Sequence, residues 1–300
     1  MLTIQHSRLE PFISTPRLAT YRRFFNPDNP VALMGCYLWN KEIASAFFPL
    51  LQILEITLRN SIHKEAHNQL GPYWFEHLAF RPTRALTQAQ RNAQQRKVDY
   101  LHNSIRDARR KIRKDLGLGP NTTVPEDQII AKVTFGFWTN LFGASFEVNR
   151  NPRALWPALL RPVFPNAPQR HRSRSNFQGR LVAIQSFRNK AFHHEPIWNI
   201  GRPGTVSDAI SNMLVMRSGI LEVLRWMSDD SAELVEKAGY SSNIERICSM
   251  EYLNYLKYPG ANVLPISRAR RSLMGIIREP RKTIDITIHG AKVGTLTTDS

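Results

Sequence analysis

The sequence has few cysteines and no long apolar run, and each absence excludes a class of protein. Only Cys36 and Cys248 occur, too few for a disulfide-stabilised secreted scaffold, so we expect buried free thiols in a reducing compartment. The longest uncharged apolar stretch, VTFGFWTNLFGASF, is too short to span a bilayer, and MLTIQHSRLEPF lacks the pattern of a secretory signal. We therefore expect a cytoplasmic protein that makes no membrane contact.

The familiar signatures of cofactor and metal chemistry are also absent. The sequence has no glycine-rich phosphate loop, no paired-cysteine metal site and no serine elbow, so we expect no cofactor and no metal. His63 and His67, in HKEAH, have a spacing that can bind zinc on a helix. They lack the glutamate directly after the first histidine that the metalloprotease helix needs, and no third ligand is signalled nearby, so we interpret them as two partly exposed helix histidines.

Acidic residues are scarce, and their scarcity is local. Lysine and arginine total 41 against 24 aspartate and glutamate, a formal net charge of +17. Residues 81–114 hold eleven basic side chains and two acids, and the stretch between Glu147 and Glu195 holds nine basic side chains and no acid. A solvated basic surface is one explanation, but a surplus this large favours a polyanionic partner such as nucleic acid.

The apolar pattern predicts helices along most of the chain. The content of 42% apolar residues supports a substantial core. Three- and four-residue spacings predict helices over 31–40, 41–70, 85–116, 176–195 and parts of 206–257, with another starting at VPEDQ and Gly71-Pro72 ending the second. KTIDITIHGAKVGTL alternates like a β-hairpin. We predict an all-α domain over 1–258 and a short basic C-terminal appendage over 259–300.

Glu55 and Arg59 are two charges inside an otherwise apolar helix, LLQILEITLRN. Their i,i+4 spacing, with glutamate first, predicts a salt bridge within the helix. Buried charges are seldom left without a partner, so the pair also fits a pocket or the seam of a dimer. Both interpretations remain open from the sequence.

The stretch RNKAFHHEP, residues 188–196, is the strongest candidate for chemistry. Pro196 stops a helix near Glu195, which predicts that His193 and His194 occupy the last turn. The negative end of the helix dipole favours a protonated imidazole there. Arg188 precedes His193 by five positions, about 140° around an ideal helix, so only a long side chain or a frayed turn brings the two together. Basic residues at a helix C-terminus are also ordinary dipole complements, and spacing alone does not decide.

At these residues the chain resembles the Abi-like family of bacterial abortive-infection proteins, a branch of the HEPN superfamily. The family signature is an arginine, a polar residue and then a histidine after a short run, matched by Arg188, Asn189 and His193. HHEPIWN resembles the continuation of that motif, and ILEITLRNSI (53–62) and TFGFWTNLFG (134–143) resemble two further family segments in the expected order. The resemblance covers roughly residues 17–230.

The resemblance implies an HEPN-like helical bundle with extra helices and a metal-independent endoribonuclease that acts as a homodimer with a composite active site. Arg188 would bind the phosphate, His193 would move protons during attack by the RNA 2′-hydroxyl, and Asn189 would orient them. His194 could replace His193, and the tail after residue 258 is not explained by the family.

Two hypotheses follow from these features. The first is a ribonuclease of antiphage abortive infection or a toxin, with RNA as substrate and an antitoxin or a phage trigger as further partner. The second is a non-catalytic helical protein that binds RNA or another partner. A transcription regulator is disfavoured because no helix-turn-helix with a glycine turn stands out.

Overall fold

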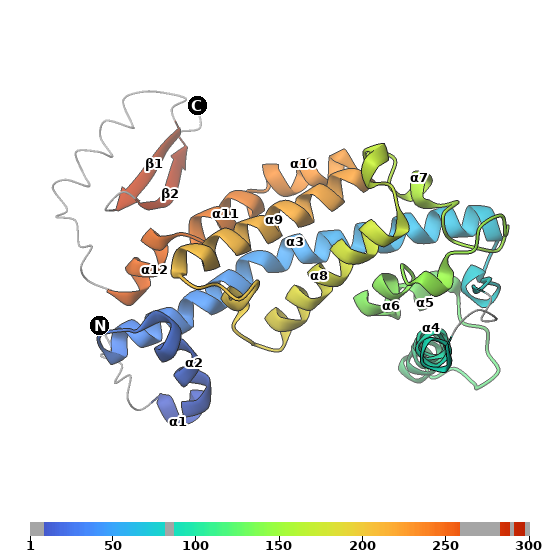
Figure 1. Cartoon of the computed structure of the whole chain (residues 1–300), viewed down its shortest axis with the longest axis horizontal. Coiled ribbons are helices and arrows are strands. Elements are labelled where there is room, and N and C mark those ends of the chain that lie inside the picture. Colours follow the sequence, from blue (N-terminus) through green and yellow to red (C-terminus); the bar gives the residue numbers. More distant parts are fainter. Residues whose placement is uncertain (1–8, 82–86, 259–282, 289–290, 298–300) are drawn as a thin grey trace. The chain divides into compact units, whose positions relative to one another are not determined.

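The computed structural model describes residues 9–81, 87–258, 283–288 and 291–297. Within them the regular secondary structure is helical apart from two short strands near the C-terminus (Figure 1). The α-helices are α1 (Glu10–Ile13), α2 (Thr15–Phe25), α3 (Pro30–Leu70), α4 (Gln88–Asp115), α5 (Glu126–Lys132), α6 (Phe135–Asn140), α7 (Leu160–Val163), α8 (Arg174–Phe192), α9 (Val206–Met227), α10 (Asp229–Lys237), α11 (Tyr240–Ile247) and α12 (Met250–Lys257). The fold is all-α, a helical bundle, as the sequence predicts.

The chain divides into two compact units. The first comprises residues 1–49, 190–217 and 238–300, and the second comprises 50–189 and 218–237. Helices α3, α8 and α9 each have residues in both. The predicted domain boundary at residue 258 stays a prediction.

Aromatic residues form the core of the first unit. Phe24 stacks on Trp198 with ring centroids 4.3 Å apart, and Tyr21 and Phe25 meet the same indole edge-on. Trp39 is fully buried and donates its indole N–H to the carbonyl of Ile247 at 2.7 Å. A buried indole with a satisfied N–H is a strong anchor, because it removes a large apolar area from water without leaving an unpaired donor.

The second unit has its own aromatic core. Phe164 and Phe177 stack at 3.8 Å, Phe142 and Trp156 stack at 4.5 Å, and the Trp156 indole N–H reaches the Leu141 carbonyl at 2.7 Å. All six tryptophans belong to the core, since none of them is more than 4% exposed.

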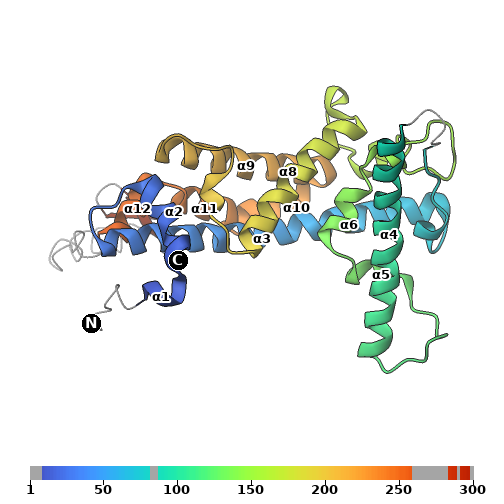
Figure 2. The same ribbon diagram turned by 60° about the horizontal axis from the view of Figure 1, so that its bottom comes forward.

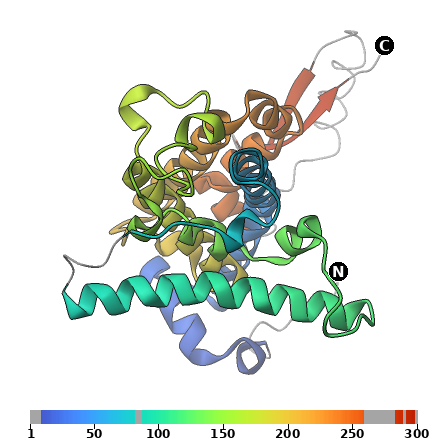
Figure 3. The same ribbon diagram turned by 90° about the vertical axis from the view of Figure 1, so that its right-hand side faces the viewer.

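The long basic segment forms α4, which packs against α5 and α6 (Figure 2). A capping box starts it, in which the Thr87 hydroxyl accepts from the Gln90 N–H and the Gln90 side chain accepts from the Thr87 N–H. Leu101, Ile105 and Ile112 form its buried edge. Figure 3 shows α4 along its length, and exposed positions on it carry Arg91, Arg96, Arg106, Arg110, Lys111 and Lys114.

Two predicted helix boundaries are wrong. Residues 31–40 and 41–70 were expected to form separate helices, but α3 runs unbroken from Pro30 to Leu70 and includes Pro49. Conversely, the helix expected to continue from VPEDQ is split into α5 and α6, because Val133 and Thr134 adopt extended backbone conformations between them. The predicted end at Gly71 is confirmed, since its left-handed backbone (φ 84°) terminates α3.

The alternating tail forms two antiparallel strands, β1 (Thr283–Ile288) and β2 (Ala291–Thr297). They occupy the segment whose alternation predicts a hairpin, and its predicted turn, His289-Gly290, lies outside the described residues.

The two cysteines are buried free thiols, as the sequence predicts. Burial raises the pKa of Cys36 to about 11, so its thiol stays protonated and unreactive. No helix among the described residues is long and apolar enough to cross a membrane.

Gly35 lets α3 and α12 approach closely within the first unit. A Cβ built on Gly35 would lie 2.6 Å from the carbonyl carbon of Leu256 and 2.7 Å from the Cα of Lys257. Both atoms belong to the backbone, which cannot move away by a change of rotamer as a side chain can. We expect Gly35→Ala to lower the free energy of unfolding by about 1–3 kcal/mol.

Urea unfolding of the variant measures this cost. Gly219→Ala is the matched control, because no atom lies within 4 Å of its added Cβ and alanine is favoured over glycine inside a helix by about 1 kcal/mol. Equal stability of the two variants would contradict the close approach of α3 and α12.

Candidate functional site

A tight turn after α8 presents the two histidines of the motif. The helix ends at Phe192. The Glu195 N–H then bonds to the Lys190 carbonyl at 2.9 Å, and the His194 N–H bonds to the Ala191 carbonyl at 3.2 Å. This is a Schellman ending, with His194 in the left-handed conformation (φ 59°) that glycine usually supplies. The prediction that His193 and His194 lie in the last helical turn is therefore wrong. The helix ends at Phe192, and the two histidines lie in the cap that follows it.

Two side chains from elsewhere in the first unit fix the same turn. Asn40, buried in α3, donates its amide to the Glu195 carbonyl at 3.2 Å and accepts from the Ile197 N–H at 2.8 Å. Arg17 in α2 donates to the His194 carbonyl at 3.0 Å. The turn is thus bonded on both sides of Glu195, while the side chains of His193 and His194 remain exposed to solvent.

Sequence reasoning missed Asn40. It ends an apolar run, MGCYLWN, and was interpreted as the end of a helix. The available signal was an uncharged amide inside a buried pattern, since a buried amide must find hydrogen-bond partners.

In the second unit, Arg188 of α8 faces α3. Its Nη2 lies 3.8 Å from Oε2 of Glu55, which makes Arg188 the salt-bridge partner of that carboxylate. The salt bridge predicted between Glu55 and Arg59 is not among those of the described residues. The Arg59 guanidinium instead donates to the side-chain oxygen of Asn60 at 3.1 Å, so Arg59 acts on Glu55 only through its charge.

The Glu55 carboxyl lies in an environment that shifts its pKa. Burial raises its pKa, and the positive charges of Arg188 and Arg59 and the Phe135 backbone amide partly oppose this rise. A carboxyl with a raised pKa beside an arginine is a common feature of functional sites, although structural ion pairs produce it as well.

The linkage between Glu55 and Arg188 predicts a pH-dependent cost of mutation. Because the folded-state pKa of Glu55 is raised, the protein loses stability as the pH rises through that pKa, and Arg188 limits the loss. Arg188→Ala should therefore cost about 0.5–1 kcal/mol of unfolding free energy near pH 7.5, the range of a partly exposed pair. The cost should fall near pH 5, where more of Glu55 is protonated.

Urea unfolding at the two pH values measures this difference. In a Glu55→Gln background the pH dependence of the Arg188→Ala cost should vanish. A cost that is the same at both pH values would contradict the linkage.

The three segments that carry the resemblance meet around Glu55 and Arg188. Residues 53–62 supply Glu55, residues 134–143 supply the Phe135 amide, and α8 supplies Arg188. The Thr139 hydroxyl of α6 donates to the Gln185 side-chain oxygen at 2.7 Å, one turn before Arg188. Segments far apart in the sequence therefore build one neighbourhood in the second unit.

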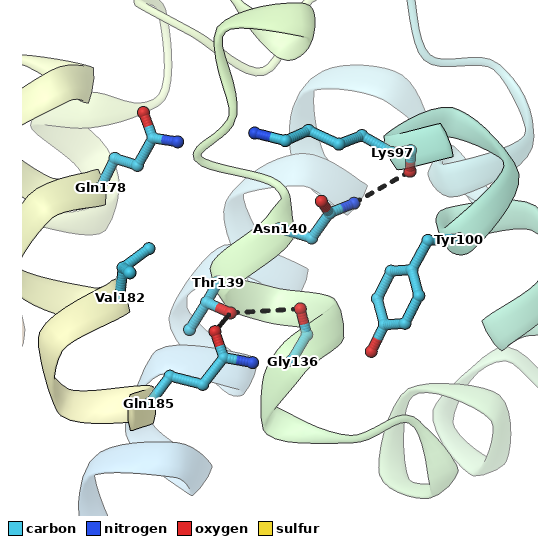
Figure 4. Close-up of a pocket in the computed structure, with 8 residues that line it drawn as sticks. All are labelled: Lys97, Tyr100, Gly136, Thr139, Asn140, Gln178, Val182 and Gln185. Atoms are coloured by element: carbon cyan, nitrogen blue, oxygen red, sulfur yellow. Dashed lines mark hydrogen bonds between the residues drawn. The ribbon is translucent and has the colours of Figure 1, made fainter. Parts of the chain in front are cut away.

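A cavity lined by both polar and apolar groups opens beside this neighbourhood (Figure 4). It has a volume of about 340 Å³. Its lining comes from α4, α6 and α8 and consists of Lys97, Tyr100, Gly136, Thr139, Asn140, Gln178, Val182 and Gln185. The α8 residues of this lining are spaced four and three apart, and a further step of four reaches Asn189, so the cavity lies along the helix face that carries Asn189.

Gly136 lies close to two side chains of the cavity lining. A Cβ at this position would lie 2.8 Å from the Tyr100 hydroxyl and 2.9 Å from the Gln185 amide nitrogen. The Asn140 amide donates to the Lys97 carbonyl at 3.0 Å, which ties α6 to α4 at the cavity wall. A larger residue at Gly136 would therefore require the ends of the Tyr100 and Gln185 side chains to shift.

Comparison with protein families agrees with this arrangement. The model of the Abi-like protein family matches residues 6–199, more than half of the chain. The chain belongs to the Abi-like protein family, and membership connects it with abortive infection. No curated protein and no solved structure matches the chain.

Proposed function

We propose that this protein is a metal-independent endoribonuclease of the HEPN type that acts in antiphage abortive infection or as a toxin. The observation that carries the proposal is the presentation of the Arg188-Asn189-x3-His193 motif. Its histidine lies on an exposed turn that Asn40 and Arg17 hold, and its arginine is oriented by Glu55. A catalytic side chain must be held by its surroundings to act, and this motif is held.

The reaction needs only the RNA and these side chains. His193 accepts the proton of a ribose 2′-hydroxyl, the 2′-oxygen attacks the adjacent phosphorus, and the bond from phosphorus to the 5′-oxygen breaks. The 5′-oxygen that leaves takes a proton from the imidazolium that His193 has become. The products are a 2′,3′-cyclic phosphate and a 5′-hydroxyl. Arg188 stabilises the charge that builds on the phosphate, a role that its permanent charge and planar fork suit. Asn189 orients the phosphate, and His194 is the alternative proton carrier.

Two surfaces support RNA as the substrate. The exposed arginines and lysines of α4 offer phosphate contacts along its length. The cavity of Figure 4 combines a lysine, an aromatic ring and several amides. Those are the groups that bind a phosphate, stack on a base and read a base edge.

We propose that the active form is a homodimer with a composite active site. One chain supplies one copy of the motif, and the residue directly before His193 belongs to an exposed aromatic pair. Phe48 and Phe192 are each 40% exposed, with ring centroids 5.3 Å apart, and a second copy would cover them. Sedimentation combined with activity assays tests this, and a fully active monomer would contradict it.

The alternative is a protein that binds RNA or another partner without cleaving. The basic face of α4 and the amide-lined cavity favour it, since both could hold RNA without help from the histidines. In either case the setting would be the cytoplasm, with a phage product or an antitoxin controlling the effector.

Incubation of the purified chain with single-stranded RNA in EDTA separates the two proposals. The ribonuclease predicts cleavage without added metal. Intact RNA, together with binding that weakens as salt rises, would favour the binding protein.

A further inference from the structure

Three side chains of types that coordinate metals meet in the second unit. His63 and His67 project from α3, and Glu126 comes from the first turn of α5. The Nδ1 atom of His67 lies 3.0 Å from Oε2 of Glu126, and that of His63 lies 3.8 Å from Oε1. One ligand atom of each residue falls within 4.8 Å of the other two.

The spacing matches a coordinated cation. Zinc binds imidazole nitrogen and carboxylate oxygen at about 2.0–2.2 Å in a tetrahedron, which places neighbouring ligand atoms about 3.4 Å apart. The two imidazole nitrogens lie 3.8 and 3.0 Å from different oxygens of the Glu126 carboxylate, on either side of that value. All three ligand atoms already lie within 4.8 Å of one another, so only a modest contraction separates this arrangement from a coordinated one.

One oxygen of the Glu126 carboxylate lacks a hydrogen-bond donor. The Oε1 atom of Glu126 is buried and has no hydrogen-bond partner. A buried carboxylate oxygen without a partner is costly, and a cation would satisfy it. The Glu126 side chain is only 11% exposed, but that of His67 is 46% exposed, which leaves a path for the ion and for a water ligand.

Trp74 holds the imidazole of His63 in place. Its indole N–H donates to Nδ1 of His63 at 3.1 Å, so this nitrogen carries a lone pair. The same lone pair can bind a cation, in which case the indole N–H must be released. Filling the site is therefore expected to change the surroundings of the Trp74 ring.

We propose that His63, His67 and Glu126 form a zinc site, with water as the fourth ligand, that joins α3 to α5. Two imidazoles and one carboxylate favour zinc over magnesium or calcium, which prefer oxygen ligands alone. The sequence pattern does not indicate the third ligand, because Glu126 lies far along the chain from HKEAH. The site is independent of the ribonuclease proposal.

Calorimetric titration of the full chain, without a polyhistidine tag, with zinc chloride tests the proposal. We expect one zinc ion per chain, a zinc-dependent rise in Tm and a change in tryptophan fluorescence. His67→Ala and Glu126→Gln should each weaken binding by at least about 100-fold, more than the loss of an outer-shell partner costs. His77→Ala, at an exposed histidine outside the cluster, should bind zinc like the wild type.

Circular dichroism of each variant confirms that the helices are intact, and Glu126→Gln nearly preserves the shape of the side chain. Absence of zinc uptake by the wild type, or equal uptake by the wild type and both cluster variants, would overturn the assignment.

Discussion

Replacement of His193 by alanine is expected to lower the rate of RNA cleavage by about 100- to 10,000-fold, the usual contribution of a positioned proton carrier. The side chain is exposed at the C-cap of α8, so its removal leaves the Schellman bonds and the contacts of Asn40 intact. The loss should therefore appear in kcat with little change in the free energy of unfolding. Initial rates on single-stranded RNA in EDTA provide the measurement.

Arg188→Ala is expected to lower the same rate by about 100- to 1,000-fold, because it removes a group that stabilises charge in the transition state. His194→Ala decides which histidine acts. If His193 acts, the His194 variant keeps most of its activity, and the reverse result transfers the role. His77→Ala serves as the control, and cleavage at the wild-type rate in both the Arg188 and His193 variants would refute the assigned motif.

Arg174→Ala is expected to cost about 2–4 kcal/mol of unfolding free energy. Arg174 is buried at the start of α8 and donates to Oε2 of Glu147 at 2.8 Å, to the Phe142 carbonyl at 2.7 Å and to the Gln178 side-chain oxygen at 2.6 Å. Breaking a fully buried ion pair costs about 3–5 kcal/mol. The Glu147 side chain is 33% exposed, which lowers the expected cost.

Urea unfolding measures that cost. Arg174→Lys should recover part of it, since lysine keeps the charge but cannot fill three acceptors in one plane. Arg161→Ala, at an exposed position of α7, should change stability by less than about 0.5 kcal/mol. An equal effect of the Arg174 and Arg161 replacements would contradict the anchoring of α8 by Arg174.

The helical class could be predicted from periodicity, but the helix ends depended on contacts that are distant in sequence. Asn40 looked like the end of a helix because it is polar. Its amide is satisfied by the loop after α8, so α3 continues past it. The break between α5 and α6 falls at two β-branched residues, Val133 and Thr134, whose extended conformation no periodic pattern signals.

The sequence names the residues of the candidate motif but does not give their geometry. The sequence indicated Arg188, Asn189, His193 and His194 through a short motif and a resemblance. It paired Glu55 with the wrong arginine, because the i,i+4 rule considers only one helix and Arg188 comes from another.

The central claim is attack by the RNA 2′-hydroxyl with proton transfer by the motif. Mass spectrometry of the cleavage products, formed in EDTA, tests it most directly. The account predicts 2′,3′-cyclic phosphate and 5′-hydroxyl ends, and no cleavage where the nucleotide preceding the cut carries a 2′-deoxyribose. Products with 3′-hydroxyl ends, or cleavage that persists at the 2′-deoxy position, would contradict it.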